Sequence, residues 1–161
     1  MNEKSENNEK LAQHGRLLKE ECDRLKKSRQ YLDRSYEKCG KVVKRRVIDD
    51  YQEDELEKME ALCARFARTT DIIIQKILPL IEYLNLNTRK GSVRDLINMG
   101  EKLELISDAN NFVEIRLLRN SIAHEYAEEN LIALFDEIMR RTPEVLSTVD
   151  KIDTYIKRTV V

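Results

Sequence analysis

Glycine and proline are scarce in this chain of 161 residues, which contains four glycines and two prolines. These two residue types supply many of the tight turns that connect the strands of a sheet. Charged residues make up 37% of the chain, a content that favours long helices with solvated surfaces. We therefore predict an all-α protein, and the length is sufficient for one domain with a buried core.

Cysteine is also rare, and its spacing argues against two classes of stabilised fold. Cys22, Cys39 and Cys63 are odd in number and form no C-x2-C pair. A disulfide framework needs cysteines in pairs, and a structural zinc site commonly takes two ligands from such a motif. We predict small core or seam residues with free thiols, and no metal or cofactor.

Long apolar runs and a dominant sign of charge are both missing. The first ten residues are polar and lack the apolar segment of a signal peptide. No apolar run approaches the roughly 20 residues that span a membrane. The net charge is −1, so any contact with nucleic acid must rest on a local basic patch. These features predict a reduced, soluble protein of the cytoplasm.

Hydrophobic periodicity predicts about five helices in an up-and-down bundle. Residues 1–8 are predicted to be disordered, and residues 9–161 to form one domain. A first helix, ending near Gly40, has an apolar residue at every seventh position, and other apolar residues add to this seam: Leu11, Leu18, Leu25, Leu32 and Cys39, with Leu17, Tyr31 and Tyr36. A second helix, from about residue 53 to 84, carries an apolar arc of about 120° and is predicted to be central. Pro79 lies opposite this arc and is expected to kink the helix on its solvent side.

The remaining helices are marked by their caps. Ser92, followed three residues later by Asp95, resembles a capping box for a short third helix that ends near residue 105. Asp108 is predicted to cap the fourth helix. In the apolar pattern that follows, Pro143 could begin a separate segment or lie within one kinked helix.

The fourth helix gathers polar groups of unlike chemistry on one side. On a helix that advances about 100° per residue, five side chains fall within an arc of roughly 160°. They are Arg116, Arg119, Asn120, His124 and Tyr126. His124 is one of only two histidines, and histidine is the side chain whose ordinary pKa suits proton transfer near neutral pH. A polar face of this kind is a candidate ligand site.

This arrangement resembles a known family motif. Arg119, four intervening residues, His124, one residue and then Tyr126 resemble the R-x4-H-x-Y motif of HEPN domains. Residues 91–108 resemble the segment that precedes the motif in bacterial HEPN proteins paired with minimal nucleotidyltransferases. The resemblance covers about residues 55–157 and implies a HEPN-like helical bundle.

The resemblance further implies a metal-independent ribonuclease toxin that acts as a homodimer on RNA. Arg119 and His124 would be catalytic, because imidazole can take the proton of a ribose 2′-hydroxyl and guanidinium can hold the charge that develops on the phosphate. Asn120, the usual companion of the motif arginine, would support them, and Arg116 would add a phosphate contact. Tyr126 would receive AMP from a minimal nucleotidyltransferase antitoxin, and the added charge would block the phosphate site.

Other interpretations stay open. The same polar arc could belong to a non-catalytic subunit that binds substrate or nucleotide for a separate nucleotidyltransferase, and the small net charge favours this hypothesis. The intact motif favours the ribonuclease. In a third interpretation the motif is vestigial on a bare scaffold, with His124 a structural hydrogen-bonding residue and Arg119 paired with Glu125 or Glu129.

Overall fold

The computed structural model describes the backbone of residues 2–86, 91–124 and 128–159, and the side chains of residues 5–86, 91–122 and 130–159. In this part of the chain the secondary structure is helical and contains no strand. The prediction of an all-α bundle is confirmed. The elements are α1 (Asn2–Cys39), η1 (Ile48–Asp50), α2 (Glu53–Ile72), η2 (Ile73–Ile77), α3 (Leu78–Leu86), α4 (Val93–Lys102), α5 (Ala109–His124) and α6 (Glu128–Thr159).

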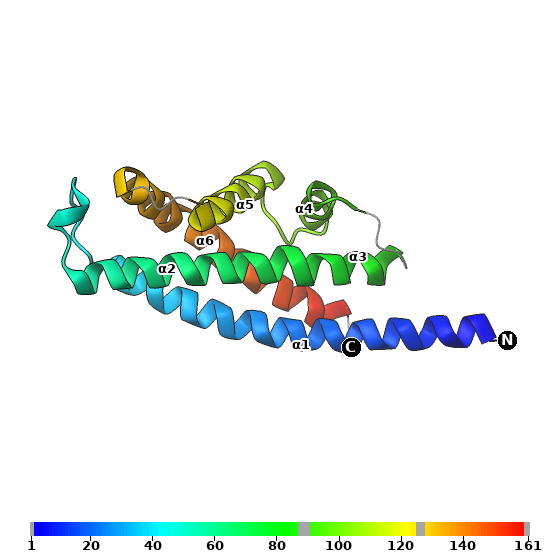
Figure 1. Cartoon of the computed structure of the whole chain (residues 1–161). Coiled ribbons are helices and arrows are strands. Elements are labelled where there is room, and N and C mark those ends of the chain that lie inside the picture. Colours follow the sequence, from blue (N-terminus) through cyan, green and yellow to red (C-terminus); the bar gives the residue numbers. More distant parts are fainter. Residues whose placement is uncertain (1, 87–90, 125–127, 160–161) are drawn as a thin grey trace.

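The helices are arranged around one long central rod formed by α2, η2 and α3 (Figure 1). Helix α1 runs antiparallel to this rod along its lower side, and α6 packs on both α1 and α2. The shorter helices α4 and α5 cover the upper side of the rod. The N-terminal turns of α1 extend beyond the other helices and include residues 2–8, which the sequence predicted to be disordered. None of the described helices combines the length and the apolar character needed to cross a membrane.

The seven-residue repeat of α1 forms its buried seam, as predicted. Leu18, Leu25 and Leu32 are fully buried. The prediction was wrong for Leu17 and Tyr31, which are 41% and 53% exposed. Each precedes a seam residue by one position, or about 100° around the helix, and this rotation turns it toward solvent.

The central rod is continuous, but Pro79 does not lie where the sequence predicted. It is buried rather than exposed to solvent. The reason is the π-helical turn η2, in which the Leu78 N–H donates to the carbonyl oxygen of Ile73. This wider turn holds one extra residue and rotates the following residues by about 100° relative to a regular α-helix. Proline has no N–H to donate, so the interruption of the α-helical ladder falls just before the residue that could not continue it.

The helix ends follow the predicted caps more closely. The Ser92 hydroxyl accepts from the Asp95 N–H at 3.2 Å, and the Asp95 carboxylate accepts from the Ser92 N–H at 2.9 Å. Asp108 accepts from the Asn111 N–H at 2.8 Å at the start of α5. Helix α4 ends at Lys102, before the predicted residue 105, because Glu104 adopts a φ of 59° and terminates the helical path.

The sequence left open whether Pro143 begins a separate helix or lies within a longer one. One helix runs from Glu128 to Thr159 with Pro143 inside it. The residue before the proline, Thr142, is fully buried, and its hydroxyl donates to the carbonyl oxygen of Ile138 at 2.7 Å. The two predicted segments are therefore a single helix.

The three cysteines are free and buried, as the sequence predicted. Burial raises the pKa of Cys22 to about 11 and the pKa of Cys63 to about 12. At pH 8 we expect Cys22 to contain roughly 100-fold less thiolate than an ordinary cysteine, and its alkylation to be slower in proportion. Mass spectrometry after a short iodoacetamide pulse, with and without urea, measures this difference. Labelling that is equally fast in the folded and unfolded protein would contradict it.

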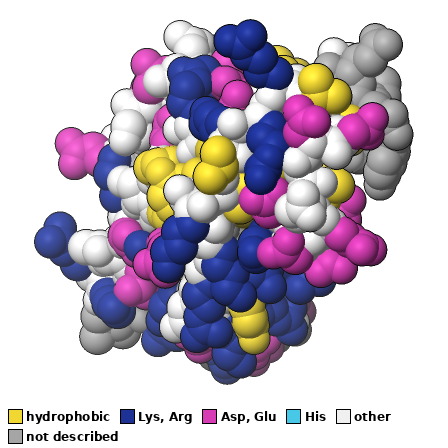
Figure 2. Space-filling view, turned by 90° about the vertical axis from the view of Figure 1, so that its left-hand side faces the viewer, with side chains coloured by type: hydrophobic (Ala, Val, Ile, Leu, Met, Phe, Trp, Pro, Cys, Tyr) yellow, Lys and Arg dark blue, Asp and Glu magenta, His cyan; other side chains and the backbone are white. Residues whose placement is uncertain are grey.

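Charged side chains occupy much of the surface. Figure 2 shows one end of the molecule, where Lys and Arg side chains gather on the lower part, the side on which α1 lies in Figure 1. The small net charge therefore does not mean an even distribution of cations.

Candidate functional site

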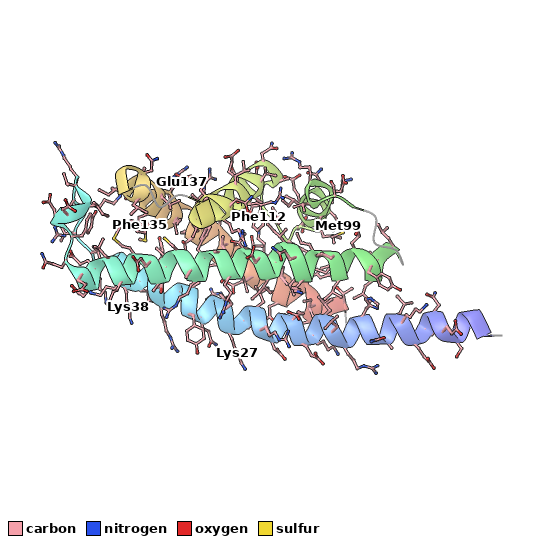
Figure 3. All side chains as sticks on the ribbon, viewed as in Figure 1. Lys27, Lys38, Met99, Phe112, Phe135 and Glu137 are labelled. Carbon is pink, nitrogen blue, oxygen red and sulfur yellow. The ribbon has the colours of Figure 1, made fainter. Side chains whose placement is uncertain are left out.

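The helix that carries the motif is held in place by one apolar face. Phe112 and Ile115 of α5 are fully buried, and Leu118 and Ile122 pack on the same core. Figure 3 shows Phe112 on the side of α5 that faces the central rod. Because this face is anchored, the side chains about 100° away from it project toward the boundary between α5 and α2.

Arg119 projects there and pairs with Asp71 of α2. The Arg119 Nη2 atom lies 2.6 Å from the Asp71 Oδ2 atom, and both side chains are about 30% exposed, at 29% and 31%. The other carboxylate oxygen of Asp71 accepts a hydrogen bond from Gln75 Nε2 at 3.2 Å. A pair this exposed adds less than about 1 kcal/mol to stability. Its main effect is to fix the direction of the guanidinium group.

Asn120 contacts the other end of the same guanidinium. The Arg119 Nη1 atom donates to Asn120 Oδ1 at 3.3 Å. The hydrogen bond with Asp71 raises the pKa of Arg119, while partial burial opposes the rise. The guanidinium is therefore a permanent cation, oriented by Asp71 and supported by Asn120.

One donor of Arg119 remains without a partner. Its Nε atom is buried and makes no hydrogen bond to any residue that the structure describes. An unsatisfied buried donor costs about 1–3 kcal/mol. The Arg119 side chain as a whole is 29% exposed, so a phosphate oxygen, an acceptor that arginine commonly takes, would reach the guanidinium through its other nitrogen atoms.

The structure describes the side chain of only one of the other three predicted site residues, Arg116. Arg116 is half-buried one turn before Asn120, and in the described part of the chain it has no ion-pair partner. The backbone of His124 ends α5. Its side chain and the whole of Tyr126 lie outside the described residues. The structure thus brings Arg119 and Asn120 together.

Asp71 and Gln75 were not predicted as parts of this site. Asp71 lies near the end of α2 and Gln75 four residues later in η2, and both precede Arg119 by more than 40 positions in the sequence. The partners considered for Arg119 from the sequence were Glu125 and Glu129, both of which follow it within ten residues. The available signal was a polar pair within the otherwise apolar end of the second helix.

The described residues contain no group of three or more His, Cys, Asp and Glu side chains suited to a metal ion. No protein-family model matches the chain, and neither the curated proteins nor the solved structures include a significant match. The HEPN resemblance therefore remains a prediction from the motif.

Proposed function

We propose that this protein is a HEPN-type, metal-independent ribonuclease toxin of a toxin–antitoxin pair that acts in the cytoplasm as a homodimer. The observation that carries the proposal is the geometry of Arg119. A permanent cation is held between Asp71 and Asn120, and its side chain is 29% exposed, so a phosphate can reach it. It lies on the helix that ends at His124.

The chemistry that these groups support is an internal transfer within RNA. His124 takes the proton of a ribose 2′-hydroxyl, and the resulting oxygen attacks the adjacent phosphorus. The bond from phosphorus to the 5′-oxygen of the next nucleotide breaks, and that oxygen takes a proton from water, while His124 returns its own proton to solvent. Arg119 holds the charge that develops on the non-bridging oxygens. The products are a 2′,3′-cyclic phosphate and a 5′-hydroxyl.

Control of the toxin follows from Tyr126 in this proposal. A minimal nucleotidyltransferase antitoxin would add AMP to the Tyr126 hydroxyl, two positions after His124 in the sequence. The attached phosphate would compete with RNA for Arg119 and repel the RNA backbone. Arg116 would add a second phosphate contact in the active protein.

One observation favours a second function, that of a non-catalytic subunit which binds substrate or nucleotide for a separate nucleotidyltransferase. The Arg119 Nη2 atom is already occupied by Asp71 at 2.6 Å. The carboxylate weakens the stabilisation that this guanidinium can give to the extra charge of a transition state, which is a smaller disadvantage for a site that only binds a phosphate.

The test is cleavage of RNA in EDTA, with the product ends identified. The wild-type protein is expected to leave 2′,3′-cyclic phosphates, and Arg119→Ala is expected to be slower by about 100-fold. Arg29→Ala is the matched control, because Arg29 also bridges two helices through a carboxylate, Asp150, and is 27% exposed compared with 29% for Arg119. Equal activity of wild type and Arg119→Ala would refute the assignment. A folded wild-type protein that leaves RNA intact would favour the binding subunit.

A further inference from the structure

Helices α1 and α2 present a face of cations that lack acidic partners. Within the described part of the chain, none of six basic side chains forms an ion pair: Lys27, Arg34 and Lys38 of α1, Arg65 and Arg68 of α2, and Lys76 of η2. Among the other Lys and Arg side chains that the structure describes, half form ion pairs, as Arg29 does with Asp150 and Lys44 with Asp136. We call these six residues the basic face.

The basic face lies on the outside of the bundle. Figure 2 shows the concentration of Lys and Arg on this side, with a hydrophobic side chain among them. Lys27 and Lys38 point away from the central rod in Figure 3. From residue 27 to residue 38, helix α1 extends for about 17 Å at 1.5 Å per residue. Along this length Lys27, Arg34 and Lys38 are available to a ligand.

A groove of about 670 Å³ runs along the boundary between α1 and α2 within this face. Its lining includes Arg24, Lys27 and Tyr31 from α1, with Arg65 and Arg68 from α2 and Lys76 from η2. The acidic residue in the lining is Glu21, which is buried and forms an ion pair with Arg24 at 2.7 Å. The groove is therefore strongly basic, and Tyr31 supplies an aromatic surface within it.

Tyr31 is arranged as an accessible ring between fixed cations. It is 53% exposed. The guanidinium carbons of Arg65 and Arg34 lie 5.6 Å and 5.9 Å from its ring centroid. Arg65 is held by hydrogen bonds to the Ser35 hydroxyl at 2.5 Å and to the Tyr31 carbonyl oxygen at 3.3 Å. A large aromatic residue that the core does not need is thus positioned at the surface beside an ordered guanidinium.

Small polar residues below the groove bring the two helices together. Ser28 and Thr69 are buried and share a hydrogen bond of 2.7 Å between α1 and α2. Their short side chains fill little space, so the longer side chains beside them form the walls of the groove. On α2, Arg68 lies about 60° from Asp71 on one side and about 60° from Arg65 on the other. Arg68, which lines the groove, and Asp71, which binds Arg119, are therefore on neighbouring sides of α2.

We propose that this groove binds a single strand of nucleic acid, with phosphates on the basic face and an unstacked base on Tyr31. Unpaired bases stack on exposed aromatic rings, whereas bases within a duplex are not accessible for this. An acidic protein segment would use the cations but would have no need of the ring. The inference rests on the proposed function in one respect, since RNA is then the strand and the groove guides it toward Arg119.

The first experiment measures binding without cleavage. A fluorescent single-stranded DNA oligonucleotide of 12 nucleotides lacks the 2′-hydroxyl and cannot undergo the proposed reaction. In fluorescence anisotropy, we expect Tyr31→Ala to weaken binding by about tenfold, because stacking of one base is lost. Tyr31→Phe is expected to bind as wild type, since it keeps the ring. Arg68→Glu is expected to weaken binding and reduce its dependence on salt.

The control is Arg140→Glu, which makes the same charge change at an exposed position of α6. It is expected to bind almost as tightly as wild type. The proposal is overturned if Tyr31→Ala and Arg68→Glu bind the single strand as tightly as Arg140→Glu does. It is also overturned if a DNA duplex binds the wild-type protein as tightly as the single strand and Tyr31→Ala does not weaken the binding of either. Circular dichroism verifies that all variants are folded.

A cleavage assay with the same variants separates this proposal from the proposed function. Binding of the oligonucleotide that depends on Tyr31, with no RNA cleavage by wild type, would support the groove and remove the ribonuclease. RNA cleavage that is unaffected by Tyr31→Ala and Arg68→Glu, at RNA concentrations below KM, would leave the ribonuclease and overturn the groove.

Discussion

His124→Ala is expected to cleave RNA about 10²–10⁴-fold more slowly than the wild-type protein, the usual range for loss of a general acid or base. The expectation follows from the proposed reaction, in which the imidazole removes the 2′-hydroxyl proton that no other group of the motif is suited to take. Alanine favours helix at the end of α5, so the change removes the base without disturbing the helix. Initial rates with a short RNA in EDTA measure the effect.

The second histidine of the chain provides the control for this variant. His14 lies on α1, where its ring stacks on Tyr83 with 3.9 Å between the centroids and its Nδ1 atom donates to the Lys10 carbonyl oxygen at 2.7 Å. We expect His14→Ala to retain the wild-type rate of cleavage. A loss of equal size in both variants would point to a structural effect and remove His124 from the mechanism.

Phe112→Ala is expected to lower the free energy of unfolding by about 3–5 kcal/mol, the cost of deleting a fully buried aromatic side chain and leaving a cavity. Phe112 is 0% exposed and lies where α5 meets the central rod. Urea denaturation followed by circular dichroism at 222 nm, which reports helix content, measures the change. Because Phe112 anchors the helix that carries Arg119, we expect RNA cleavage to fall as well.

Leu117→Ala is the matched control on the same helix. Leu117 is 49% exposed, and replacing a side chain at such a position usually changes stability by no more than about 0.5 kcal/mol. If Phe112→Ala and Leu117→Ala were equally stable, α5 would not be anchored to the core in the way described here.

Features set by neighbours in the chain were predicted well. The capping box at Ser92 and the cap at Asp108 depend on residues three positions apart, and both are present. The buried seam of α1 follows from a seven-residue repeat, which any helix converts into a stripe. Of the five polar residues assigned to the fourth helix, four lie on α5, and Arg119 and Asn120 are in contact there. Tyr126 lies outside the described residues.

Features set by the path of the chain in space were not predicted. Pro79 is buried because the π-turn η2 rotates the end of the central rod, and a helical wheel assumes a regular helix. Tyr31 was assigned to the seam of α1, although its ring is exposed beside Arg65 of another helix. Whether a side chain lies in the core, between two helices or in solvent depends on how the helices are rotated relative to one another.

The sequence by itself determined the all-α class, the positions of the helices, most of their caps and the polar arc of the motif helix, because these follow from residue type and from spacings within one helix turn or two. Only the tertiary structure decided which residue pairs with Arg119 and where the unpaired Lys and Arg side chains gather. Asp71 meets Arg119 because α5 packs on α2, and the basic face arises because α1 and α2 place their unpaired Lys and Arg side by side. The net charge of −1 is a sum over all residues, and such a sum contains no information on which charges are neighbours.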